Sequence, residues 1–125
     1  MLVREPNWQV IADLWDESAN AYGSRLCYVE TRAALAARGR GSRRHRRQLT
    51  QAKAELEQRW EGLTVVELSE LVREVAALAA EQHSLRGADA VHLASAAVLG
   101  SDVTMVTRDS ALRRASLAAG LDVAP

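Results

Sequence analysis

The stretch LRGADAVHLASAAVLG, residues Leu85 to Gly100, decides how this chain folds. Nearly every side chain after Gly87 is apolar, which is typical of a helix buried on all sides. Asp89 stands at its beginning, and His92 follows one turn later. Because an unpaired carboxylate is costly to bury, Asp89 is either the cap of this helix or part of a site that requires negative charge.

The segments that follow this helix, and those just before it, alternate between strand and helix patterns. The predicted strands are 63–68, 102–107 and 121–124, and the predicted helices are 69–83 and 109–119. Ser69 is the predicted N-cap of the first of these helices, and Gly120 is expected to close the second. Strands separated by helices predict a three-layer α/β/α domain with a short parallel sheet.

The first half of the chain is predicted to be helical. Apolar residues recur at helical spacing over 7–20, a second helix is expected from Ser24 to the glycines at 39 and 41, and a third from Ser42 to Trp60. Neither repeats nor a linker divides the 125 residues, so one domain spanning residues 1–125 is expected.

Composition excludes several classes of protein. The chain is 48% hydrophobic, and no apolar run approaches the roughly 18 residues that a membrane span requires. The first ten residues, MLVREPNWQV, carry charges and a proline where a signal peptide would be apolar, so we expect a cytoplasmic protein. The single cysteine, Cys27, cannot form an internal disulfide, and no zinc-binding pattern surrounds it.

Charge is unevenly distributed although the formal net charge is zero. The segment 38–47, RGRGSRRHRR, contains six arginines and no acid: Arg38, Arg40, Arg43, Arg44, Arg46 and Arg47. Such a cluster either contacts nucleic-acid phosphates or forms a solvated loop and helix start, and the sequence leaves both interpretations open.

Three carboxylates are candidates for a shared site. Asp109 closely follows a predicted strand, where ligands of parallel sheets bind, although helix capping is the commoner use of an aspartate at such a position. Glu30 is expected on the inward stripe of its helix or at an edge that reaches water. If Glu30, Asp89 and Asp109 converge, they require a cation, and oxygen ligands favour Mg²⁺ or Mn²⁺. Phosphodiester hydrolysis is the chemistry that such a site supports.

Four stretches resemble the PIN domain, and specifically the VapC-type toxins of bacterial toxin–antitoxin pairs. These stretches are SRLCYVETRAALA, LRGADAVHLASAAVLG, VTRDSAL and AAGLDV. The resemblance implies a metal-dependent endoribonuclease, usually a homodimer, that is held inactive by a VapB-like antitoxin.

The resemblance also assigns site residues. Glu30, Asp89 and Asp109 match the second, third and fourth acidic positions of the family, and Thr107 matches its small hydroxyl residue. His92 is interpreted either as a group that supports the site or as a hydrogen-bonded core histidine. The remaining alternatives are a module that binds an antitoxin or RNA without cutting, and a plain α/β domain whose acids are caps.

The sequence departs from the family's pattern at the start of the chain. Family members open with a short apolar strand that ends in an aspartate, and this chain begins at Met1 just beyond it. We therefore expect the central strand and the first acidic ligand to be missing, which exposes backbone groups on the neighbouring strands. Either the assigned start lies inside a longer gene, which we favour because the other elements stay in register, or the chain is truncated and inactive.

Overall fold

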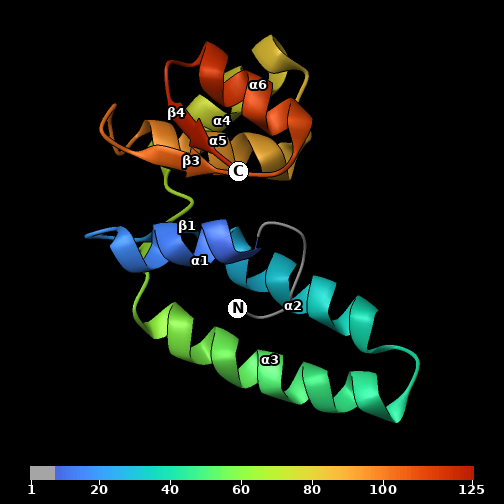
Figure 1. Ribbon diagram of the computed structural model, residues 1–125. Coiled ribbons are helices and arrows are strands. Elements are labelled where there is room, and N and C mark those ends of the chain that lie inside the picture. Colours follow the sequence, from blue (N-terminus) through green and yellow to red (C-terminus); the bar gives the residue numbers. More distant parts are fainter. Residues whose placement is uncertain (1–7) are drawn as a thin grey trace. The chain divides into compact units, whose positions relative to one another are not determined.

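The computed structural model describes residues 8–125 as two compact units, one ending at Thr64 and one running from Val65 to Pro125. Figure 1 shows the elements: α1 (Trp8–Glu17), β1 (Tyr22–Ser24), α2 (Leu26–Gly39), α3 (Arg43–Glu61), β2 (Thr64–Val66), α4 (Glu70–His83), α5 (Gly87–Ala97), β3 (Thr104–Val106), α6 (Ser110–Ala118) and β4 (Asp122–Ala124). The predicted start of the first helix at Asn7 lies outside the described residues.

The first unit is dominated by a hairpin of two helices, α2 and α3 (Figure 1). Leu35 of α2 packs with Ala52 and Leu56 of α3, and these side chains are 3–6% exposed. The connection between the helices is short, since α2 ends at Gly39 and α3 begins at Arg43. Ser42 caps α3 by accepting a hydrogen bond from the backbone N–H of His45 at 3.2 Å. The predicted boundary between these helices is therefore confirmed.

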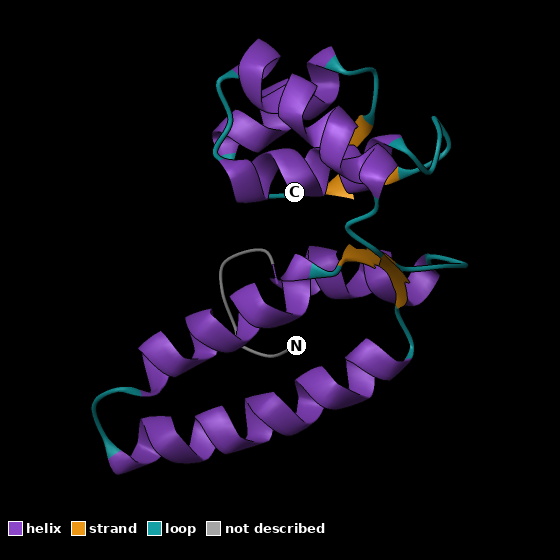
Figure 2. Ribbon diagram, turned by 180° about the vertical axis from the view of Figure 1, so that it is seen from behind, coloured by secondary structure: helices purple, strands orange, loops and turns teal. Residues whose placement is uncertain are grey.

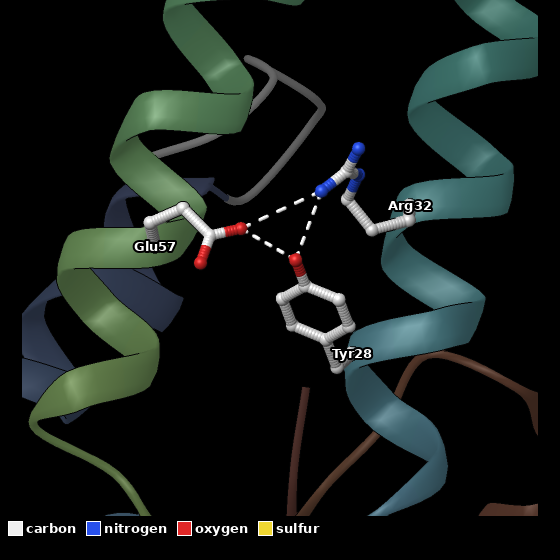
Figure 3. Close-up of polar contacts among 3 residues, drawn as sticks. All are labelled: Tyr28, Arg32 and Glu57. Atoms are coloured by element: carbon white, nitrogen blue, oxygen red, sulfur yellow. Dashed lines mark hydrogen bonds and ion pairs between the residues drawn. The ribbon is translucent and has the colours of Figure 1, made fainter.

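A polar cluster also joins the two helices (Figure 3). The Tyr28 hydroxyl donates to Oε1 of Glu57 at 2.5 Å, and Nη1 of Arg32 donates to the Tyr28 hydroxyl oxygen at 2.9 Å. The ring of Tyr28 meets that of Trp60 edge to face, with centroids 5.3 Å apart. This cluster and the apolar contacts together fix which face of α2 is turned toward α3.

The strand β1 was not among the predicted elements. It pairs with β2 in a two-stranded sheet, and the backbone N–H of Thr64 donates to the carbonyl of Ala21 at 2.9 Å. The second helix was expected to begin at Ser24, but it begins at Leu26 with Arg25 at the cap position, and the Ser24 hydroxyl accepts a hydrogen bond from the N–H of Leu26. The residues just before α2 therefore form β1 rather than the first turn of the helix.

The second unit is built around α5. Ala90, Leu93 and Ala94 are at most 2% exposed, and they pack with apolar side chains of α4 and α6. This confirms the prediction that LRGADAVHLASAAVLG forms a buried helix, and its many alanines allow the neighbouring helices to approach closely. The core of this unit is therefore built from alanine, valine and leucine side chains of all three helices.

Two short parallel strands complete the second unit (Figure 2). Thr104 of β3 is paired with Asp122 of β4, and Val106 with Ala124. The N–H of Thr107 extends the ladder by donating to the carbonyl of Ala124 at 3.1 Å. Because the strands are parallel, their carboxyl ends lie at the same edge, and β3 leads from that edge into α6.

The α/β class and the short parallel sheet are confirmed, with strands shorter than predicted. The strands form two separate pairs, β1 with β2 and β3 with β4. The expectation of one domain over residues 1–125 stays a prediction. Over residues 8–125 no helix is long and apolar enough to cross a membrane.

Ser69 begins α4 as predicted, since its hydroxyl accepts a hydrogen bond from the N–H of Val72 at 3.2 Å. We expect Ser69→Ala to lower the free energy of unfolding by about 1 kcal/mol, because one helix N–H loses its acceptor. Ser69→Asp, which restores an acceptor, is the control and should unfold at the wild-type urea midpoint. Equal urea midpoints for Ser69→Ala and the wild type would contradict this role.

Candidate functional site

Asp109 lies at the carboxyl end of β3, as the sequence predicted, and it is the N-cap of α6. Its Oδ1 accepts a hydrogen bond from the N–H of Leu112 at 2.8 Å. The hydroxyl oxygen of Thr107 accepts from the N–H of Asp109 at 3.1 Å, which fixes the backbone just before the helix. A carboxylate has two oxygens with about four lone-pair sites, so capping through Oδ1 leaves Oδ2 of this exposed side chain able to bind a cation.

Asp89 is not a cap. Arg86 occupies the cap position of α5, and no side chain accepts a hydrogen bond from the helix end there. Asp89 lies within the first turn, where the helix dipole favours a negative charge. Its Oδ2 is 3.3 Å from Nε of Arg86, and its side chain is 20% exposed, against 84% for Arg86. The Asp89 carboxylate is therefore mostly buried, and the exposed guanidinium group of Arg86 balances its charge.

The prediction that Glu30 lies on the inward stripe of its helix is wrong. Glu30 is exposed on α2, as are Ala33, Ala34 and Ala37, which follow it by three, four and seven positions on the same side of the helix. The buried face of α2 instead carries Leu35 and Gly39, where α3 packs. The alternative, an edge position whose carboxylate reaches water, is the one that the structure supports.

The predicted residues are divided between the two units. Glu30 belongs to the first unit, whereas Asp89, Asp109, Thr107 and the half-buried His92 belong to the second. Among residues 8–125, no three His, Cys, Asp or Glu side chains are grouped so as to hold a metal ion. The donors themselves, carboxylate oxygens without a thiol or a pair of imidazoles, fit a hard divalent cation. Convergence of the three acids stays a prediction.

The six arginines lie where α2 ends and α3 begins. All six are exposed: Arg38, Arg40, Arg43, Arg44, Arg46 and Arg47. Nε of Arg40 donates to the carbonyl of Ala36 at 3.4 Å, so this guanidinium folds back over the end of α2. The hairpin thus carries six exposed arginine side chains around its turn.

Sequence reasoning did not identify one residue at the candidate site, Arg86. Arg86 precedes Asp89 by three positions in the stretch LRGADAV, a spacing that brings side chains together at the first turn of a helix. That spacing was the available signal. The consequence is that Asp89 has an arginine beside it, which balances its charge.

These features define a class of protein: an α/β chain with an aspartate in the first turn of a buried helix and a second aspartate after a parallel strand. The chain belongs to the PIN domain family, whose model matches residues 1–117. It is also 40% identical, over its whole length and 88% of theirs, to two Mycobacterium tuberculosis proteins. They are Ribonuclease VapC45 of strain CDC 1551 / Oshkosh and Ribonuclease VapC49 of strain ATCC 25618 / H37Rv.

Proposed function

We propose that this chain is an endoribonuclease that depends on Mg²⁺ or Mn²⁺ and acts as the toxin of a toxin–antitoxin pair. The observation that carries the proposal is the 40% identity across the full chain to two proteins named ribonucleases. Membership of the PIN domain family supports it. The partners proposed with it are an RNA substrate, a VapB-like antitoxin and a second copy of the chain.

The residues proposed to hold the ion are Asp89, Asp109 and Glu30. When bound, the ion would supply an activated water and would neutralise charge on the phosphate. Asp89 is suited to this role because its carboxylate lies at a helix N-terminus and makes no capping bond. Thr107 positions Asp109 through the backbone, and we propose that it acts on the site only in that way.

The proposal is tested by titrating MnCl₂ and MgCl₂ into the purified chain by calorimetry, with a parallel RNA-cleavage assay. Cleavage should require the metal, stop with excess EDTA and return when Mn²⁺ is added beyond the chelator. Residual cleavage in EDTA would contradict metal dependence. Absence of cleavage with every divalent metal would leave the alternative, a module that binds an antitoxin or RNA without cutting.

A further inference from the structure

The turn of the α2–α3 hairpin carries a charge pattern that the fold itself does not require. Arg43, Arg44, Arg46 and Arg47 fall within the first five positions of α3, whose first turn contains no acid. In the described residues 8–125, none of these four arginines forms an ion pair with a carboxylate. We name these four side chains, with Arg38 and Arg40 at the end of α2, the arginine tip.

The arginine tip is electrostatically unfavourable for the isolated helix. The N-terminus of a helix carries a partial positive charge, so cations there are repelled. Arg43 also lies three and four positions from Arg46 and Arg47, and like charges at these spacings repel each other. A ligand with several negative charges would remove both penalties at once.

The chemistry of the tip selects the kind of ligand. Residues 38–47 contain arginine, glycine, serine and histidine but no apolar side chain, so a protein partner would find no apolar anchor there. Guanidinium groups bind phosphates through paired hydrogen bonds, and the free N–H groups at the start of α3 add further donors. A sugar–phosphate backbone fits this surface better than an acidic peptide does.

The tip lies at the turn between α2 and α3, and Glu30 lies on α2 of the same unit. Arg38 and Arg40 follow Glu30 by eight and ten residues on or next to α2, which places them about 12–15 Å further along the helix axis. That separation corresponds to a few nucleotides of an RNA strand. The tip is therefore too far from Glu30 to touch the same phosphate.

We propose that the arginine tip is a second RNA-binding site, which holds phosphates of the substrate a few nucleotides away from the bond that is cut. The inference rests on the proposed action on RNA. The arginine tip raises the affinity for RNA that is long enough to reach it. A short oligonucleotide that is bound only near Glu30 does not contact the tip.

The test compares the wild-type chain with R43Q/R44Q/R46Q/R47Q. Binding of a fluorescein-labelled 20-nucleotide RNA of mixed sequence is followed by anisotropy in EDTA, from low to high NaCl. Because each phosphate contact contributes roughly 0.7 to the slope of log K against log salt for single strands, the slope should become shallower by about 2.8. At about 0.1 M salt, affinity should fall on the order of 100-fold, whereas a four-nucleotide RNA should bind both proteins equally.

Two controls separate charge at the tip from other effects. The matched variant R43K/R44K/R46K/R47K keeps the four charges and should keep the salt slope. Lys53→Gln removes one charge midway along the same helix and should change affinity less than about twofold. The melting temperature of the Gln variant should not decrease, because its substitutions relieve repulsion at the start of α3.

Equal slopes for the wild type and the Gln variant would overturn the proposal. So would a Gln variant that keeps its RNA affinity but loses affinity for a glutamate-rich peptide, because that result assigns the tip to an acidic protein. A cleavage assay with Mn²⁺ keeps this result distinct from the proposed function. Binding that depends on the tip in a chain that never cuts refutes the nuclease alone, whereas cutting with an unchanged slope refutes the tip alone.

Discussion

Asp89→Asn is expected to lower the rate of RNA cleavage by about 100-fold or more while the protein stays folded. Loss of a group that merely orients a metal ligand typically costs 10–100-fold, so loss of a ligand should cost at least as much. The side chain makes no capping bond to α5, and its partner Arg86 is 84% exposed. A pair of this kind contributes about 1 kcal/mol or less, so the urea midpoint should change little.

The matched control for this variant is Arg86→Gln. It breaks the same ion pair but leaves the Asp89 carboxylate in place, so cleavage should persist at close to the wild-type rate. Calorimetric titration with Mn²⁺ should show weakened metal binding for Asp89→Asn only. If both variants lose cleavage equally, the ion pair rather than the carboxylate is what the reaction needs.

Asp109→Ser is expected to lower the rate of cleavage by about as much as Asp89→Asn does, without destabilising α6. Serine accepts the hydrogen bond from the N–H of Leu112 nearly as well as aspartate, but it is a poor ligand for a divalent cation. Asp109→Ala should lose both functions, with cleavage reduced about 100-fold and the free energy of unfolding reduced by about 1 kcal/mol.

Comparison of these two variants separates the cap from the ligand. Ser69→Ala provides a further reference, because it removes a cap from α4 and should leave cleavage intact at a similar loss of stability. Rates and urea midpoints measured on the same preparations give both quantities. Full cleavage by Asp109→Ser would mean that Asp109 is a cap and nothing more.

The elements whose signals are local were predictable from the sequence. Ser42, Ser69 and Asp109 each accept a hydrogen bond from an N–H three residues further on. Such caps depend on a few consecutive residues, so sequence reasoning located the starts of α3, α4 and α6 to within a residue. The unbroken apolar run around Leu93 likewise identified α5 as the buried helix.

Features that depend on distant partners were decided only by the tertiary structure. Tyr22–Ser24 forms a strand because β2, some forty residues later, pairs with it, and three residues carry no strand pattern of their own. Packing against α3 also determined which face of α2 is buried. Alanine occurs on several of its faces, so apolar spacing alone did not fix which one α3 would cover.

The candidate site illustrates the same division. The identities of Glu30, Asp89 and Asp109, and the helix starts at which the two aspartates stand, came from the sequence. The sequence did not determine that Glu30 is exposed, or that Asp89 leaves the cap position of α5 to Arg86 and is only 20% exposed. Local hydrogen-bonding patterns depend on consecutive residues, whereas the exposure of a side chain depends on which surfaces pack together, and only the tertiary structure decides that.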